Sequence, residues 1–342
     1  MSQPTKTCIP WIGGKAKLIW LIDLLLPPRY QRFIDVFGGG GTVTFSRPNI
    51  EGGLKVYNDF NCDLVNFFSC VKNRPMELLH ELNFLPLNSR DEFDVLCKFL
   101  SGDEFDDPYM EQELELVEQY FEPPEQETLK QLIFQKTGRN EVKRAADYFK
   151  QLRYSYCGGG KSFAGKGCDI RRFFHEIWAC SRYLNDTNAV LENKDFDSLI
   201  RQYDREGAVF YCDPPYYKAE DCYAVEFGEK DHIRLRDTVL GVKGYVMISY
   251  NYCERIMELY RDHFYIFYTT RPNSMSQIPG SLYEEIILTN YDPRLFDSIR
   301  PHQMTMFDEV REDTDGREYK LINEPTDKTY IRSLQIKSQA LK

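Results

Sequence analysis

The feature that most constrains the fold is a short buried strand that runs directly into four glycines. The strand is RFIDVF (32–37), the glycines are GGGG (38–41), and a helical pattern follows them. GLKVYN (53–58) then predicts a second strand, and CDLVNFFSCVKN (62–73) predicts the helix after it. Strand, glycine turn, helix and strand in this order are typical of the opening of a doubly wound α/β sheet.

Alternation of strands and helices stops near residue 73 and resumes near residue 182 with AVLENKDF, GAVFYCDPP and GYVMISYN. The stretch between contains helical windows such as MELLHELNFL and EVKRAADYFKQL but no repeated alternation. We therefore predict a Rossmann-like sheet domain from residues 1–72 and 182–300. An inserted, mostly helical domain is expected at 73–181, and a polar C-terminal extension at 301–342.

Charge is unevenly distributed along the chain. The net charge of −10 excludes a protein that is basic overall, but acids concentrate at 89–128 and basic residues between 130 and 182. Nucleic-acid affinity depends on where the basic groups lie, so a DNA-facing surface is expected in the second of these segments. The acidic segment is expected to face away from DNA or to contact another protein.

The ten cysteines and five histidines are scattered, and no CxxC pair occurs. We expect reduced cysteines that serve as small core residues in the cytoplasm, and no metal site. No apolar stretch is long enough for a membrane span, and the first ten residues lack the apolar core of a signal peptide.

The acid before the glycines indicates which ligand the turn receives. Asp35 would repel a pyrophosphate but attract a cationic amino-acid group, and the glycines Gly38 and Gly40 allow a ligand to approach the backbone. Asp59 follows the second strand, where a carboxylate can bind the ribose hydroxyls of an adenosine-type cofactor. A ribose-binding acid without a phosphate site favours S-adenosylmethionine over NAD.

A second acid ends another predicted strand, in FYCDPPYY (210–217). An exocyclic amino group of a nucleobase is a weak nucleophile, and Asp213 can stabilise the positive charge that develops on it. The carbonyl of Pro214 can accept its second N–H, while the Pro214–Pro215 elbow holds both acceptors rigidly. Tyr216 can stack on a base turned out of the duplex. The stretch therefore predicts an amine-methylating site.

These segments resemble the motifs of Dam-like DNA adenine-N6 methyltransferases. FYCDPPYY contains their DPPY signature, DVFGGGG resembles their cofactor loop, and PWIGGK resembles their opening WxGGK motif. VYNDFN and LENKDF resemble the family's ribose-binding and adenine-binding segments, and the order of the motifs is the family's. The resemblance implies a Rossmann-like class I methyltransferase sheet with an inserted target-recognition domain, and transfer of a methyl group from S-adenosylmethionine to adenine N6 in duplex DNA, leaving S-adenosylhomocysteine.

The resemblance also implies the site residues. The catalytic residues are expected to be Asp213, Pro214, Pro215 and Tyr216. The cofactor is expected to contact Trp11, Lys15, Asp35, Phe37, Gly38, Gly40, Asp59, Asp195 and Phe196. Candidates for DNA contacts are Arg139, Asn140, Lys143, Arg144, Arg153, Lys161 and Arg271.

Two alternatives share much of this evidence. N4-cytosine methylation uses the same geometry on another exocyclic amine, although Asp rather than Ser before Pro-Pro and the WxGGK-first order favour adenine. A catalytically silent DNA-binding subunit would keep the fold but not require Asp213 and Tyr216. RNA adenine methylation is a more distant alternative. The expected setting is a bacterial or phage-encoded, monomeric cytoplasmic enzyme on double-stranded DNA, with a cognate restriction endonuclease as a candidate partner.

Overall fold

The computed structural model describes residues 4–11, 13–83, 90–101, 110–130, 141–155, 160, 162–165, 168–217, 227–272, 281–296 and 318–332. The chain divides into two compact units. The first comprises Met1–Pro4, Gly14–Asn61 and Asp186–Lys342, and the second comprises Thr5–Gly13 and Cys62–Asn185.

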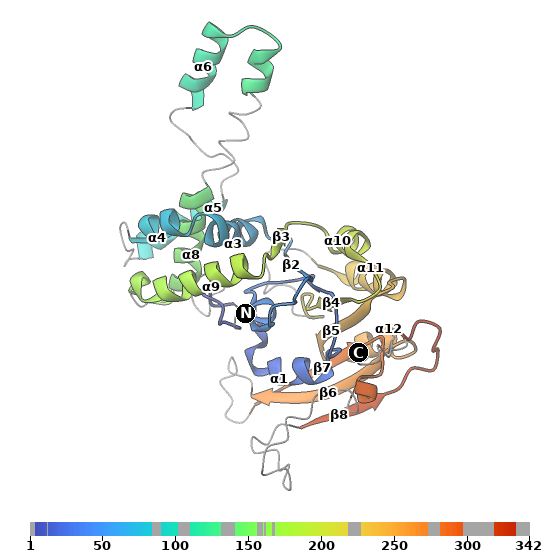
Figure 1. Cartoon of the computed structure of the whole chain (residues 1–342). Helices are drawn as coiled ribbons and strands as arrows, with labels where there is room; N and C mark the ends of the chain where they lie inside the picture. The colour runs from blue at the N-terminus through green and yellow to red at the C-terminus, as the bar shows by residue number, and fades with distance from the viewer. Residues whose placement is uncertain are drawn as a thin grey trace. The chain divides into compact units, whose positions relative to one another are not determined.

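An eight-stranded sheet, counted over the described residues, organises the first unit (Figure 1). Its strands are β1 (Arg32–Asp35), β2 (Leu54–Asn58), β3 (Val190–Glu192), β4 (Ala208–Cys212), β5 (Tyr245–Asn251), β6 (Tyr265–Pro272), β7 (Leu282–Thr289) and β8 (Tyr319–Asn323). They lie in the order β3-β2-β1-β4-β5-β7-β6-β8. Strands β3 to β5 in this order are parallel, and β7, β6 and β8 each run antiparallel to their neighbour.

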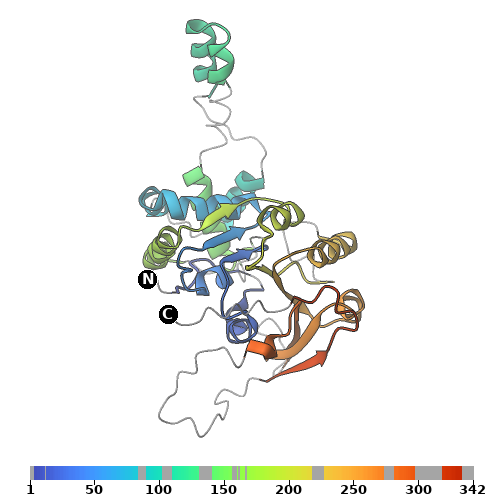
Figure 2. The same ribbon diagram turned by 45° about the vertical axis from the view of Figure 1, so that its right-hand side comes forward.

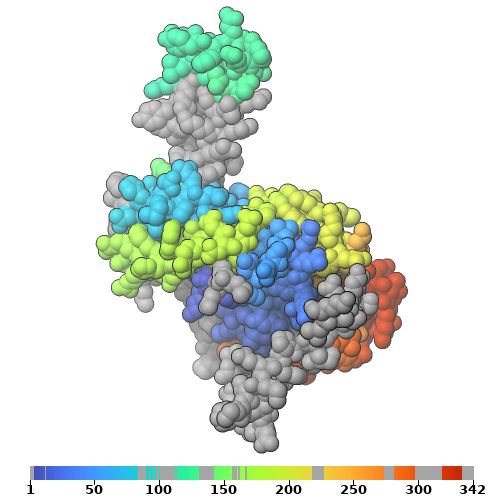
Figure 3. All heavy atoms as spheres, in the orientation of Figure 1, coloured from blue at the N-terminus to red at the C-terminus, as the bar shows by residue number. Residues whose placement is uncertain are grey.

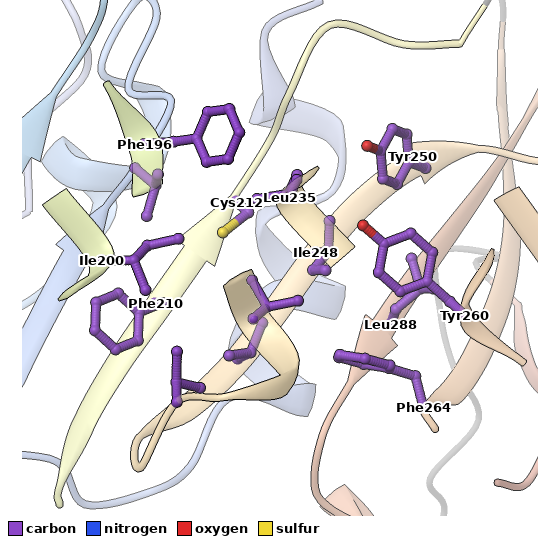
Figure 4. Close-up of a cluster of buried hydrophobic side chains, with 14 of the residues drawn as sticks. Phe196, Ile200, Phe210, Cys212, Leu235, Ile248, Tyr250, Tyr260, Phe264 and Leu288 are labelled. Carbon is purple, nitrogen blue, oxygen red and sulfur yellow. The ribbon is translucent and has the colours of Figure 1, made fainter. Parts of the chain in front are cut away.

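Both faces of the central strands are covered by helices, and successive side chains of a strand point alternately to the two faces. On β4, Phe210 and Cys212 join the layer beneath α10 (Phe196–Tyr203), α11 (Glu229–Leu240) and α12 (Glu254–Tyr260). Figure 4 shows this layer from Phe196 to Phe264. Val209 and Tyr211 point the other way, onto α1 (Ile19–Leu25), and Figure 2 shows α10 and α1 on opposite sides of the sheet.

The chain reverses its winding between β1 and β4. From β1 the sheet grows in one direction through β2 and β3, and from β4 it grows in the other through β5. Asp35 at the end of β1 is in register with Tyr211, two residues before Asp213. Ligands of open α/β sheets bind at the carboxyl ends of strands where the order reverses, so Asp35 and Asp213 lie where a ligand is expected.

The second unit is helical. Its helices are α3 (Cys62–Asn73), α4 (Pro75–Asn83), α5 (Arg90–Ser101), α6 (Met110–Tyr120), α8 (Glu141–Tyr154) and α9 (Phe174–Asp186), with the short η3 (Ile170–Phe173). Phe149 of α8 stacks on Phe67 of α3, at 5.5 Å between ring centres. Asn185 of α9 donates to the carbonyl of Lys72, and the spheres of α3, α4 and α9 form one continuous surface (Figure 3).

The strands predicted around the glycine turn, DPPY and GYVMISYN are present, as are the helices predicted at 62–73 and 141–152. The compact units divide the chain at 61/62 and 185/186, where the sequence suggested 72/73 and 181/182. The reason is that α3 packs its apolar side chains on α8, although it follows β2 directly. The tail predicted as a polar extension contributes β8, which pairs with β6.

Candidate active site

Three acids follow three neighbouring parallel strands at the carboxyl edge of the sheet. Asp35 ends β1, Asp59 follows β2 and Asp213 follows β4. Each lies in the first unit, and each belongs to a different sequence motif. The fold therefore brings together the acids of the predicted cofactor loop, ribose segment and DPPY motif.

Asp213 is held by a lysine from the start of the chain. Its Oδ2 lies 2.6 Å from Nζ of Lys15, in the short η1 (Lys15–Lys17), and the lysine side chain is 3% exposed. Its Oδ1 is buried and accepts no hydrogen bond from the described residues. Burial raises the pKa of Asp213 to about 6, although Lys15 opposes the shift. The group is thus a carboxylate at neutral pH with one oxygen available for a donor.

The ring of Tyr216 completes this part of the site. It is 4% exposed, packs nearly parallel to Tyr283 at 6.3 Å, and lies 4.8 Å from Nζ of Lys15. The sequence grouped Lys15 with the cofactor residues, and the structure places its ammonium group on the Asp213 carboxylate and over the Tyr216 ring. The lysine thus makes the two contacts that the sequence predicts for the target amino group and its base, one with the Asp213 carboxylate and one with the Tyr216 ring.

A second buried charge pair lies close to Asp213 and was not predicted. Glu285 of β7 is fully buried and accepts from Nε of Arg271 at 2.6 Å, while its Oε2 has no hydrogen-bond partner among the described residues. The negative charge of Glu285 raises the pKa of Asp213, and the positive charge of Arg271 lowers it. Arg271 was predicted as a DNA contact, and its guanidinium also lies 4.9 Å from the Tyr283 ring centre.

The glycine turn is shaped by the residues around it. A Cβ on Gly38 would lie 2.2 Å from the ring of Tyr57, so this position admits no side chain unless the ring moves. Gly39 and Gly41 adopt φ values of 49° and 75°, which other residues rarely adopt. The amide of Gly39 donates to Oδ2 of Asp59 at 2.8 Å. The turn and the predicted ribose acid are therefore fixed to each other.

Asp35 lies beneath this turn with its carboxylate incompletely satisfied. Its Oδ2 accepts from the hydroxyl of Thr44 at 2.6 Å, but its Oδ1 has no hydrogen-bond partner among the described residues. Burial raises its pKa to about 7, and the negative charges of Asp213 and Asp59 add to the shift. A buried acid of this kind is stabilised by an incoming cation, which fits the amino group of S-adenosylmethionine.

The predicted adenine subsite is an aromatic cluster at the start of α10. The rings of Phe37, Phe196 and Phe227 lie 5.6 to 5.8 Å apart. Asp195 caps α10 by accepting from the amide of Asp197 at 3.0 Å. Arg234 of α11 pairs with Asp195, a contact that the sequence did not indicate.

Asn58 was also missed as a site residue. Its side-chain amide donates to the carbonyls of Val36 and Lys194, and its Oδ1 accepts from the amide of Lys194 at 2.8 Å. One buried amide thereby holds the loops after β1, β2 and β3 together. The motif VYNDFN contained the residue, but only the acid beside it has an evident chemical role in the sequence.

The remaining predicted residues lie in the second unit or outside the described residues. Trp11 is half-buried, Lys143 is exposed, and Arg139, Asn140 and Lys161 lie outside the described ranges. Arg144 pairs with Asp63 and donates to the carbonyl of Leu100 at 3.2 Å. Arg153 donates to the carbonyl of Cys8 and lies 3.5 Å from the Phe173 ring centre. Both arginines thus make contacts within their own unit, and base contacts by them stay a prediction.

Comparison with known proteins identifies the family. The family model described as D12 class N6 adenine-specific DNA methyltransferase matches residues 11–275, which is well over half of the chain. The chain belongs to this family. It is an adenine-specific DNA methyltransferase, and the predicted Rossmann-like methyltransferase fold is confirmed.

Relatives support the same assignment. The Type II methyltransferase M1.LlaDCHI of Lactococcus lactis subsp. cremoris is 26% identical over 305 residues, covering 82% of this chain and 94% of the relative. A DNA adenine methylase of Vibrio cholerae serotype O1 is 33% identical over 100 residues, covering 28% and 35%. The Type II methyltransferase M.CviBI of Paramecium bursaria Chlorella virus NC1A is 21% identical over 257 residues, covering 75% of this chain and 86% of the relative.

No helix in the described ranges combines the length and apolarity needed to cross a membrane.

Proposed function

We propose that this methyltransferase binds S-adenosylmethionine along the carboxyl edge of β1, β2 and β3 and methylates N6 of an adenine turned out of duplex DNA at a specific site. The observation that carries the proposal is Asp213, a largely buried carboxylate with one oxygen on Lys15 and the other, itself buried, without a hydrogen-bond partner among the described residues. A buried acceptor that lacks a donor is costly, and an exocyclic amino group supplies that donor.

In this proposal, each group of residues at the carboxyl edge binds one part of the cofactor. Asp35 would bind its amino group, and Asp59 its ribose hydroxyls, since each carboxylate oxygen can accept more than one hydrogen bond. Asp195, Phe196 and Phe37 would hold its adenine. Gly38 and Gly40 would let it approach the backbone, and Trp11 and Lys15 remain proposed contacts. When bound, this cofactor supplies a methyl group on a cationic sulfur.

The DPPY residues would activate the target amine. Asp213 accepts one N–H of the adenine amino group, and the carbonyl of Pro214 accepts the other, so the nitrogen can become tetrahedral. Pro215 keeps the two acceptors in place, and Tyr216 packs against the base. The lone pair of N6 would take the methyl group that the bound cofactor supplies, S-adenosylhomocysteine would be the leaving group, and N6 would then lose one proton to water. Asp213 stabilises the positive charge on N6 until that proton leaves.

Sequence recognition is proposed for the second unit, with Arg271 as an additional contact near the flipped base. The other proposed DNA contacts are Arg139, Asn140, Lys143, Arg144, Arg153 and Lys161.

The enzyme is proposed to act as a monomer in the cytoplasm, where bacterial or phage DNA is present. A cognate restriction endonuclease is proposed as a partner, because two relatives are named Type II methyltransferases.

Methylation-sensitive long-read sequencing of DNA from cells that express the protein tests the proposed function. We expect N6-methyladenine in one short sequence motif, and none with Asp213→Ala. N4-methylcytosine would contradict adenine as the target. Unmodified DNA from cells that contain the folded wild-type protein would contradict DNA methylation, and structured RNA would then be offered as the substrate.

A further inference from the structure

Arg234 makes an unusual pair of contacts at the start of α10. Its Nη1 and Nη2 lie 2.8 and 2.9 Å from the two carboxylate oxygens of Asp195. Its Cζ lies 4.0 Å from the ring centre of Phe196. A planar group with N–H donors therefore lies over the phenylalanine and binds the neighbouring acid at the same time.

These are the two contacts proposed for the cofactor adenine. An adenine would stack on Phe196 and donate its amino group to Asp195, and a guanidinium is also flat and rich in donors. The Arg234 fork uses both oxygens of Asp195, and Oδ1 also accepts from the amide of Asp197. Both oxygens of the carboxylate are thus engaged before any ligand arrives.

We propose that Arg234 occupies the adenine subsite of the ligand-free enzyme and must leave it when the cofactor binds. The inference rests on the proposed function, because that function assigns Asp195 and Phe196 to adenine. Arg234 is then a competitor built into the chain, and it weakens the apparent affinity for the cofactor.

The surroundings of Arg234 allow this movement. Its side chain is 44% exposed, so displacement toward solvent does not require a rearrangement of the core. Nη2 also lies 3.1 Å from Oδ1 of Asp231, one turn earlier on α11. This second acid can keep the guanidinium paired after Asp195 has been taken over by the adenine.

Two substitutions separate competition from a general charge effect. Arg234→Ala removes the competitor, whereas Arg234→Lys keeps the positive charge but loses the planar fork and the stacking surface. Arg201→Ala is the matched control, because Arg201 forms an exposed pair with Asp197 on α10 at 2.9 Å. Thermal unfolding of each variant shows whether it is folded.

Affinity for two ligands is measured by titration calorimetry. S-adenosylhomocysteine is the cofactor product, and 5′-methylthioadenosine is an uncharged ligand that keeps the adenine and ribose but lacks the amino-acid part. For Arg234→Ala we expect a Kd about 3- to 10-fold lower for both ligands, since apparent affinity scales with the fraction of open subsite. Arg234→Lys should also lower Kd, and Arg201→Ala should match the wild type.

A higher or unchanged Kd for Arg234→Ala would overturn the inference, because Arg234 would then cover the bound adenine or lie outside its site. If Arg234→Ala does not fold, Arg234→Lys decides by the same criterion. Failure of the wild type to bind either ligand would contradict the proposed cofactor site itself. The two failures are therefore distinguishable.

Discussion

Lys15 and Asp213 are 198 positions apart in the chain and form a largely buried ion pair of 2.6 Å between Nζ and Oδ2. The pair joins the opening WxGGK-like motif to the DPPY motif. It leaves Oδ1 of Asp213 without a hydrogen-bond partner among the described residues and keeps the carboxyl group partly ionised despite its burial. The charges around Asp213 therefore set the pKa of its carboxyl group, and this pKa decides the pH range in which the target amine can be activated.

Replacing Lys15 by Gln should move the acidic limb of activity to higher pH. Lys15 lowers the pKa of Asp213, so its removal raises that pKa above the present value of about 6. We expect kcat/KM at pH 6 to fall roughly 3- to 10-fold more than kcat/KM at pH 8. Lys17→Gln is the control, because Lys17 is exposed on the same short helix. An unchanged pH profile for Lys15→Gln would show that another group controls the limb.

Replacing Glu285 by Gln should move the same limb in the opposite direction. The negative charge of Glu285 raises the pKa of Asp213, so the neutral amide should lower it and extend activity to more acidic pH. The neighbouring Glu284 is exposed and provides the control Glu284→Gln. The measurement is the pH dependence of kcat/KM for the three proteins. A limb that moves upward with Glu285→Gln would refute the electrostatic explanation.

Asp35→Asn should stabilise the ligand-free protein at pH 8 and weaken cofactor binding. Because burial raises the pKa of Asp35 to about 7, the native chain holds a proton between pH 4 and 7 that the unfolded chain has released. The free energy of unfolding therefore falls as pH rises through this window. Removing the charge should restore roughly 1–4 kcal/mol at pH 8.

Urea unfolding at pH 5.5 and pH 8 measures this effect, with Asp186→Asn as a control at an exposed aspartate. The stability difference between Asp35→Asn and the wild type should be larger at pH 8. Titration with S-adenosylhomocysteine should show weaker binding, because Asp35 is the proposed partner of the amino group. If Asp35→Asn were less stable than the wild type at pH 8, the interpretation of Asp35 as a destabilising buried charge that a ligand neutralises would be contradicted.

Much of the central sheet could be predicted from the sequence, because local signals determine it. The apolar strands, the glycine turn and the acids Asp35, Asp59 and Asp213 are each visible within a few residues. Their convergence then follows from a general property of parallel sheets, whose strands end at a common edge. The motif order supplied the family, which the comparisons confirmed.

The side-chain partners could not be predicted in the same way. Nothing local indicates that Lys15 meets Asp213, that Glu285 lies near them, or that Arg234 binds Asp195, because each pair joins distant parts of the chain. Strand β8 lies in a polar segment with a weak apolar pattern. It forms because it pairs with β6, a long-range contact that its own sequence does not indicate. The packing of α3 on α8 likewise depends on tertiary contacts and not on a local sequence pattern.

The most direct test of the central claim is single-turnover methyl transfer by Asp213→Asn. The substrate is a duplex oligonucleotide that carries the motif found by sequencing, and binding of S-adenosylhomocysteine is measured on the same preparation. Asparagine keeps the shape of the side chain but cannot stabilise a positive charge as a carboxylate does. We predict a rate at least about 100-fold below that of the wild type, with cofactor affinity within a few-fold. A rate close to that of the wild type would contradict the role of Asp213 in activating the amine.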